Sequence, residues 1–189
     1  MTTARADDNK DAGFTLIELL IYSMLMVLVL AIVGGMIVSF TSTSKTVGSI
    51  TQVSTSGQLA AQSVERGIRN ASDFQLTTPT GTDQLLVART AGGGATLTWK
   101  CAAWYYSASD STLRYTSSAT AIPAPTAADL SHWTLLGSDI APTTGAEIFS
   151  STGPQLTLAF TIHAAGHPPQ ALTSTAVSRA GSSGTPACY

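Results

Sequence analysis

The chain has 189 residues, of which only 11% are charged, and its formal net charge is −2. It holds no lysine- or arginine-rich cluster, and its arginines at 66, 69, 89 and 114 are scattered, so nucleic acid is not expected as a partner. Apolar residues concentrate near the N-terminus, whereas Ser, Thr, Ala and Gly dominate the rest of the chain.

The first predicted element is an apolar helix of membrane length. From Phe14 to Val38, Glu18 is the only formal charge. A helix of about 25 residues is ~37 Å long, against a hydrocarbon core of ~30 Å. An acid near the centre of a bilayer costs ~2.5–3.5 kcal/mol on insertion scales, which makes Glu18 a candidate functional residue.

A short polar segment, residues 1–13, precedes this run and contains Arg5 and Lys10 together with three aspartates. If the chain is cut after Gly13, the new amino terminus on Phe14 lies about one helical turn, ~6 Å of rise, from Glu18. Between staggered parallel helices, the amine of one subunit can then meet the carboxylate of the next in a low-dielectric environment, where such a pair is worth much more than in water. The pattern predicts a device that sets the register between stacked helices.

The segment Gly13-Phe14-Thr15-Leu16-Ile17-Glu18 resembles the leader-peptidase and N-methylation motif of the type IV pilins and pseudopilins. The resemblance implies cleavage between Gly13 and Phe14 by prepilin peptidase, methylation of the Phe14 amine and a role for Glu18 in subunit docking. It also implies a single-pass protein of the cell membrane, with its leader in the cytoplasm, that later enters an extracytoplasmic pilus or pseudopilus filament. The expected partners are other pilin and minor pilin subunits, the prepilin peptidase, the inner-membrane assembly platform and membrane lipid.

A secretory signal peptide and a plain signal anchor are the other interpretations of the apolar run. A signal peptide has an apolar core of about 7–15 residues before a small-residue cleavage site. This run is longer, carries Glu18 and ends in Val38-Ser39-Phe40-Thr41 without such a site. A signal anchor explains the length but has no use for Glu18. The sequence therefore favours a cytoplasmic leader, 1–13, followed by a transmembrane or filament-core helix, 14–40.

The helix is expected to continue as an amphipathic extension over residues 41–72. Apolar or small residues recur there at the spacing of one helix face, at Val47, Ile50, Val53, Gly57, Ala61, Val64 and Ile68. Within the membrane part, Gly34 and Gly35 each cost ~1 kcal/mol relative to Ala, which favours local softening of the helix. Close packing against a neighbouring helix through small residues explains the two glycines equally well.

Residues 73–189 are expected to form a β-rich extracytoplasmic domain. The clearest alternation of apolar and polar residues lies at 155–162, and 96–101 shows the same period of two. The other expected strands are 84–90, 103–107, 112–116, 133–136, 147–150 and 171–179. Short turns favour an antiparallel sheet covered by the apolar stripe of the helix. The predicted fold class is α+β and pilin-like, with a long N-terminal helix packed on an antiparallel β-sheet.

Cys101 and Cys188 are the only cysteines. In an extracytoplasmic domain an oxidised pair is expected. Joining them closes a long loop, worth roughly 4–5 kcal/mol in the chain-entropy model, and clamps the C-terminal tail onto the central sheet. Free thiols and a link between subunits are the alternatives.

No motif for catalysis is found in the sequence. His132, His163 and His167 lack metal-ligand spacing with one another and with the cysteines. A nucleophile elbow, a phosphate loop and a paired-carboxylate motif are also missing, and the glycines at 92–94 are interpreted as a turn. The chain is therefore not expected to be an enzyme or to hold a cofactor or a metal.

The order of elements beyond the helix loosely resembles the W-type minor pilins and J-type pseudopilins: the segment 64–71, a strand at 85–87, an aromatic strand at 104–106, and Leu113-Arg114-Tyr115. Trp104, Tyr106 and Arg114 are expected to have structural roles. The resulting hypothesis is a minor pilin or pseudopilin at or near the filament tip that helps to initiate assembly. A filament-displayed adhesin or DNA-uptake receptor is the alternative, and an anchored surface protein that never polymerises is a further one. The same N-terminal logic serves motility pili, competence pili and type II secretion.

Overall fold

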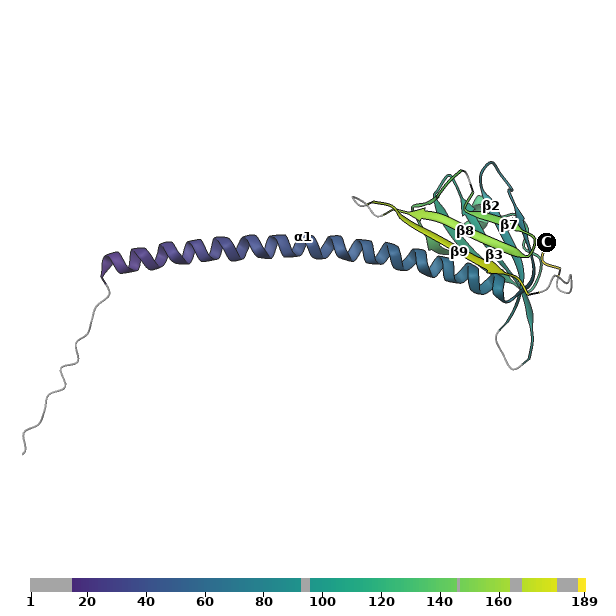
Figure 1. The fold of residues 1–189 in the computed structure, drawn as a ribbon, viewed down its shortest axis with the longest axis horizontal. Helices are drawn as coiled ribbons and strands as arrows, with labels where there is room; N and C mark the ends of the chain where they lie inside the picture. Colours follow the sequence, from purple (N-terminus) through teal and green to yellow (C-terminus); the bar gives the residue numbers. More distant parts are fainter. Residues whose placement is uncertain (1–14, 93–95, 146, 164–167, 180–186) are drawn as a thin grey trace, which may run out of the picture. The chain divides into compact units, whose positions relative to one another are not determined.

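The computed structural model describes residues 15–92, 96–145, 147–163, 168–179 and 187–189, without the side chains at 42, 44–47, 49 and 50. One long helix, α1 (Leu16–Arg69), is followed by nine strands and the short helix α2 (Ala127–Leu130) within these ranges (Figure 1). The chain divides into two compact units between Val47 and Gly48. The first unit contains the membrane-length part of α1, and the second contains the end of α1 and all of the strands.

In the first unit, α1 is a regular helix whose side chains are not buried by the rest of the chain. The stretch Leu16–Thr41 is long and apolar enough to cross a membrane, with a mean hydropathy of 2.7, and no part of it is buried within the chain. It is the only helix of this kind among the residues described. Gly34 and Gly35 lie inside α1, and a Cβ at either position meets nothing within 4 Å. The surface of this stretch must therefore be covered by lipid or by other helices.

In the second unit, the end of α1 is the central element of the core. The predicted apolar stripe is confirmed at the four buried positions Gly57, Ala61, Val64 and Ile68. Val53 packs against the same core, whereas the side chains of Val47 and Ile50 lie outside the described set.

The helix ends slightly earlier than the predicted extension to residue 72. α1 stops at Arg69, and strand β1 starts at Ala71, so the sheet region begins before the predicted boundary at residue 73. Asn70 makes the transition, because its N–H still donates to the Arg66 carbonyl at 3.1 Å. Its own carbonyl accepts the N–H of Ala91 at 3.0 Å, which starts the pairing of β1 with the neighbouring strand, β2.

Five strands form the first sheet, in the order β1-β2-β3-β4-β5, and every pairing is antiparallel. Their bounds are β1 (Ala71–Thr77), β2 (Gln84–Ala91), β3 (Trp99–Ser107), β4 (Thr112–Ser118) and β5 (Thr134–Gly137). β3 joins the strand expected at 103–107 to the end of the strand expected at 96–101. Its residues from Cys101 to Ser107 are all buried. Both faces of this part of the strand are covered, so apolar and polar residues do not alternate along it.

A second sheet corrects the expectation of one sheet. It contains β6 (Ile140–Pro142), β7 (Phe149–Thr152), β8 (Gln155–Ile162) and β9 (Gln170–Val177). β6 and β7 pair with different parts of β8, and β9 pairs along the whole of β8. β8 has the predicted bounds and the alternating burial of a strand with one covered face. A two-residue turn joins β7 to β8, with Gly153 at a φ of 58°, as a tight hairpin requires.

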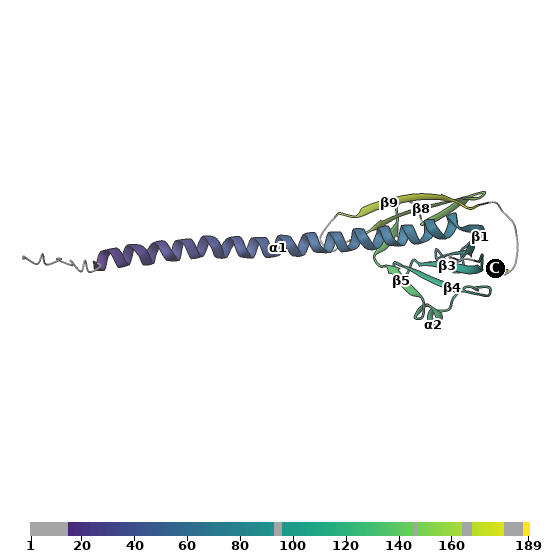
Figure 2. The same ribbon diagram turned by 90° about the horizontal axis from the view of Figure 1, so that it is seen from below.

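The core of the second unit lies where α1 meets both sheets. Figure 2 shows the end of α1 between β8 and β9 on one side and β3 and β4 on the other. Buried side chains of the helix and both sheets form one cluster, which includes Val64, Trp104 and Phe160. A smaller cluster around Leu85, Cys101 and Cys188 covers the opposite face of the five-stranded sheet. The arrangement confirms the α+β class, with a long helix packed on antiparallel strands.

Candidate functional site

Glu18 lies in the first turn of α1, where its own helix provides two contacts. Thr15 caps this turn, because its Oγ1 accepts the N–H of Glu18 at 3.3 Å and its carbonyl accepts the same N–H at 3.1 Å. The hydroxyl of Tyr22, one turn later, donates to Glu18 Oε1 at 3.2 Å. A carboxylate at this end of a helix is also favoured by the helix dipole.

These contacts leave the Glu18 carboxylate able to bind a cation. Its two oxygens offer about four acceptor positions, and the side chain is only half-buried. A neutral hydroxyl does not cancel its charge, so a positive group is the strongest partner within a membrane or a helix bundle. Gly13 and Phe14, the positions of the predicted cleavage and methylation, lie outside the described residues. The pairing of Glu18 with a Phe14 amine therefore stays a prediction.

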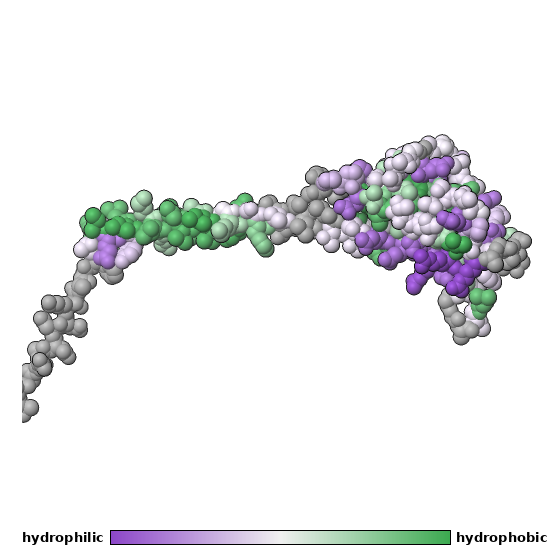
Figure 3. Space-filling view, in the orientation of Figure 1, coloured by the Kyte–Doolittle hydropathy of each residue, from purple (hydrophilic) through white to green (hydrophobic). Residues whose placement is uncertain are grey.

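The surface around this acid is almost entirely apolar. Hydrophobic side chains cover most of the visible face of the membrane-length stretch, Leu16–Thr41 (Figure 3). Most large side chains along it are more than half exposed, among them Met24, Val38 and Phe40. A soluble monomer does not tolerate such a continuous apolar surface, so it marks a contact with lipid or with other helices.

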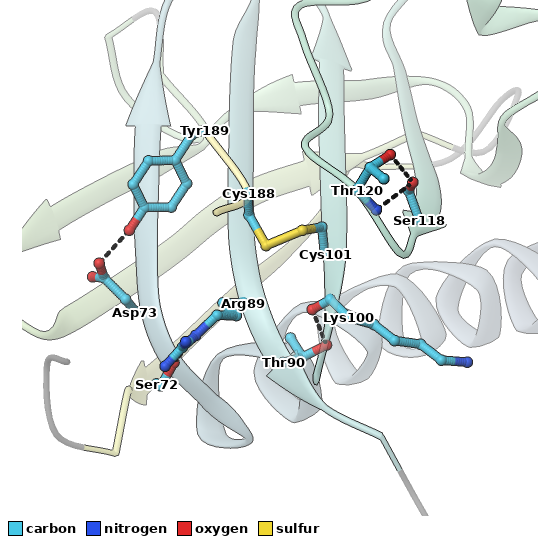
Figure 4. The surroundings of a disulfide bond; sticks show 10 residues. All are labelled: Ser72, Asp73, Arg89, Thr90, Lys100, Cys101, Ser118, Thr120, Cys188 and Tyr189. Carbon is cyan, nitrogen blue, oxygen red and sulfur yellow. Dashed lines mark hydrogen bonds between the residues drawn. A yellow bond between two sulfur atoms is a disulfide. The ribbon is translucent and has the colours of Figure 1, made fainter. Parts of the chain in front are cut away.

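Cys101 of β3 and Cys188 of the C-terminal tail are joined by a disulfide with an S–S distance of 2.01 Å (Figure 4). Both residues are buried. Two hydrogen bonds hold the tail beside them: Ile122 donates its N–H to the Cys188 carbonyl at 3.1 Å, and the Tyr189 hydroxyl donates to Asp73. The tail is thus fixed to the face of the five-stranded sheet that α1 does not cover.

An open groove of about 850 Å³ lies beside the end of α1. The helix forms one wall, and β2, β3 and β4 contribute most of the other lining residues. Three arginines border it: Arg66 and Arg69 from the last turns of α1, and Arg179 just after β9. Arg69 forms an ion pair with Glu65, with Nη2 and Oε2 3.2 Å apart. We call this region, lined by Leu59, Gln62, Ser63, Glu65, Arg66, Gly67, Arg69, Asn70, Thr90, Ala91, Ala102, Trp104, Tyr115 and Arg179, the basic groove.

The aromatic floor of the basic groove is part of the core. Trp104 is 1% exposed, as predicted for a core residue, and its Nε1 donates to Ser63 Oγ at 3.1 Å. Tyr115 lies beside it, with the ring centroids 5.4 Å apart. Tyr106 is also buried, and Arg114 donates to the Leu130 carbonyl at 3.2 Å, in line with the structural roles predicted for both.

The basic groove was not predicted from the sequence. Arg66 and Arg69 are three residues apart on a helix, a spacing that places them on neighbouring positions of one side and was visible in the sequence. No sequence pattern around Arg179 indicates that it lies in the groove. It reaches the helix end because Ser178 donates its N–H to the Pro154 carbonyl and Arg179 donates its N–H to the Ala71 carbonyl, at 2.9 and 3.0 Å.

No metal site is found among the residues that the structure describes, since none of their His, Cys, Asp and Glu side chains form a group of three or more that could hold an ion. His132 and His163 are exposed. His167 and two of the glycines of the expected turn, Gly93 and Gly94, lie outside the described residues.

Residues 8–34 match the model of one known family, the prokaryotic N-terminal methylation motif. No curated protein and no solved structure matches the chain. The motif supports a type IV pilin-like protein that is processed by prepilin peptidase and assembles with other pilin subunits. It points to a structural protein and not to an enzyme. Together with the apolar helix, it fits a single-pass membrane anchor that later enters a filament.

Proposed function

We propose that this type IV pilin-like protein is a minor pilin or pseudopilin that acts at or near the tip of a filament and helps to initiate its assembly. Prepilin peptidase removes residues 1–13, and the exposed amine of Phe14 is methylated. The observation that carries the proposal is Glu18: a single acid in the first turn of an apolar helix, inside the methylation motif.

In this mechanism the apolar surface supplies adhesion and Glu18 supplies register. When the helix leaves the bilayer, neighbouring helices must cover its apolar side chains, which alone would allow many axial shifts. A carboxylate buried without a positive partner costs several kcal/mol, so shifts that leave Glu18 unpaired are disfavoured. The shift that brings a neighbour's Phe14 amine to Glu18 is thereby selected.

The tip assignment is supported by the size of the second unit and by the order of its elements. Two sheets with nine strands in the described residues follow the helix, and the disulfide fixes the tail to the larger sheet. W-type minor pilins and J-type pseudopilins, which the chain loosely resembles, carry larger sheet domains at this position of the filament. Low copy number relative to the main subunit follows from this assignment.

The test replaces Glu18 and measures how much of the protein enters filaments sheared from the producing cells. Glu18→Gln keeps the shape but loses the charge, so we expect it to abolish incorporation as fully as Glu18→Ala. Tyr22→Phe and Thr15→Ala are the matched controls, because each removes one of the contacts of Glu18 and leaves the carboxylate. Both should still be incorporated, and all four variants should reach the membrane.

N-terminal sequencing of the protein recovered from cells with and without the peptidase completes the experiment. The proposal requires a mature chain that starts at Phe14 only when the peptidase is present. A chain that still starts at Met1, or full incorporation of Glu18→Gln, contradicts it and favours an anchored surface protein.

A further inference from the structure

Strand β9 is an open edge of the second sheet. It pairs with β8 along its whole length, and no other described strand pairs with it. Figures 1 and 2 show it on the outside of the sheet, beside the end of α1. Proteins usually protect such an edge with charges, prolines, bulges or a short strand. β9 has eight residues, none of them charged or proline, and its pairing with β8 is regular.

The other sheet edges are protected in these ways. β1 carries a bulge and the charged Asp73, whereas β5, β6 and β7 have only three or four residues each. In the described part of the chain, β9 is thus the long edge that can accept a further strand. A partner that pairs with a sheet edge gains affinity from main-chain hydrogen bonds and specificity from its alternate side chains.

The hydrogen bonds of β8 show which main-chain groups of β9 are free. Ala159 donates its N–H to the Ile148 carbonyl at 2.9 Å, on the side of β7, and His163, just after β8, donates to the segment before β6. Because these directions alternate along a strand, the even-numbered residues of β8 bond to β9, and their partners there are even-numbered too. The N–H and C=O groups between them point outward, and no described residue is bonded to them: Ala171, Thr173, Thr175 and Val177.

A pocket of about 220 Å³ opens between the free edge and α1. Its lining includes Thr173 at the edge itself, the exposed Gln58 and Gln62 of α1, and the buried Leu158 and Phe160 of β8. A strand added to β9 directs every second side chain to the face that α1 covers, and so towards this pocket. A cavity of ~150 Å³ holds a benzene ring, so this pocket has room for an aliphatic side chain.

Positive charge lies at the end of this edge. Arg179 follows β9 by two residues, and its N–H is bonded to the Ala71 carbonyl, which closes the edge there. Its side chain and that of Arg66 line the basic groove. Neither forms an ion pair within the described residues, whereas Arg69 pairs with Glu65. A carboxylate at this end of an added strand therefore finds guanidinium groups to bind.

We propose that the free edge of β9 binds an extended segment of a different protein, with aliphatic side chains at every second position and an acidic residue at the end next to Arg179. The segment runs antiparallel to β9, as neighbouring strands of this sheet do, so the acid is at its N-terminal end. A second copy is a poorer occupant, because antiparallel pairing of two β9 edges brings Pro168 and Pro169 to Arg179 and no acid. The site lies wholly in the second unit and does not depend on the proposed function.

The test uses the mature full-length protein in detergent and a synthetic peptide, acetylated at its N-terminus and labelled at its C-terminus. The peptide is an aspartate followed by four threonines that alternate with three valines. On the β9 edge, the threonines make the main-chain bonds and the valines face α1. Fluorescence anisotropy should show saturable binding. N-methylation of the valine amides should leave binding intact, whereas N-methylation of the threonine amides removes the donors to the edge and should weaken binding about tenfold or more.

Two matched variants test the edge itself. Thr175→Pro removes a free N–H and leaves the bonds between β9 and β8 complete, so it should weaken peptide binding about tenfold. Thr175→Ala keeps the main chain and should bind as the wild type does. Hydrogen exchange measured by NMR needs no substitution: the amides of Thr173 and Thr175 should exchange fast in the free protein and slowly with the peptide. The amides of Leu172 and Ser174 should be slow in both states.

A second peptide, with asparagine in place of the aspartate, tests the acidic end. The wild-type protein should bind it about threefold more weakly than the first peptide at low salt, and the difference should vanish at high salt. Arg179→Gln should bind both peptides equally, since it removes the charge that the aspartate meets and keeps the main-chain bond to Ala71.

The possible outcomes separate this inference from the proposed function. Absence of saturable binding, or equal binding of the two N-methylated peptides, overturns the inference. A concentration-dependent dimer of the free protein with protected amides at Thr173 and Thr175 also overturns it and favours a second copy as the occupant. Equal binding of the aspartate and asparagine peptides by the wild type overturns the acidic end of the segment. Entry into filaments is measured separately on variants of Glu18, so either result can fail while the other stands.

Discussion

Gly67 determines how closely α1 approaches the five-stranded sheet. A Cβ at this position would lie 2.1 Å from Cη2 and 2.5 Å from Cζ2 of Trp104. The indole cannot move aside easily, because it is fully buried and its Nε1 is bonded to Ser63, four residues earlier on the same helix. The absent side chain thus makes room for the largest side chain of the core.

Gly67→Ala is therefore expected to destabilise the second unit although alanine favours helices. Overpacking costs typically about 1–3 kcal/mol, and the overlap at Gly67 is severe, whereas the propensity gain is at most ~1 kcal/mol. All three tryptophans lie between residues 99 and 133, so their fluorescence in urea reports the unfolding of this unit alone. Gly48→Ala is the control, since nothing lies within 4 Å of its Cβ position. Equal midpoints for the two variants would contradict this account.

At the scale of residues, the sequence predicts those features that depend only on residues close together in the chain. The pattern from Gly13 to Glu18 is readable because a cut and a charge one helical turn apart define its chemistry locally. The need for glycine at 67 is not readable, since it comes from a residue 37 positions later in the chain. Arg179 joins the basic groove for the same reason, through pairing that only the fold creates.

At the scale of elements, strands with one covered face were predicted best. β8 has the expected bounds because its side chains alternate between core and surface. β1 was missed because it begins with a bulge and contains polar Ser72 and Asp73. β6 has only three residues and ends in Pro142, which cannot donate a ladder hydrogen bond. Without β6, the second sheet could not be recognised as separate from the first.

The disulfide is the main link between the C-terminal tail and β3, and its loss should be measurable. Cys101→Ser with Cys188→Ser should lower the free energy of unfolding of the second unit by about 2–4 kcal/mol, because the sequence separation of 87 residues makes the freed loop long. Reduction of the wild-type protein should shift the urea midpoint equally. Tyr189→Phe is the control, since it removes a single tail hydrogen bond, worth about 0.5–1.5 kcal/mol. A midpoint that reduction leaves unchanged would show that the tail does not depend on the bond.

At the scale of the whole molecule, the two units have opposite requirements. The first exposes an apolar helix that needs lipid or other helices, and the second buries its apolar side chains around α1 and two sheets. Glu18 is the only described charge in the apolar stretch, whereas the second unit exposes charged side chains of both signs, such as Arg66 and Asp110.

This division predicts that the second unit folds without the first. Every buried hydrophobic residue described in the core lies at Ala60 or later, so a chain that starts at Gly48 loses none of them. We expect it to stay in solution without detergent and to unfold in urea within about 0.5 kcal/mol of the full-length protein, as for changes away from the core. The mature full-length chain, measured in detergent, is the reference, and Gly67→Ala in the shortened chain should show the same loss of stability as in the full one. A shortened chain that aggregates or lacks a cooperative transition would mean that the apolar helix is needed for folding as well as for assembly.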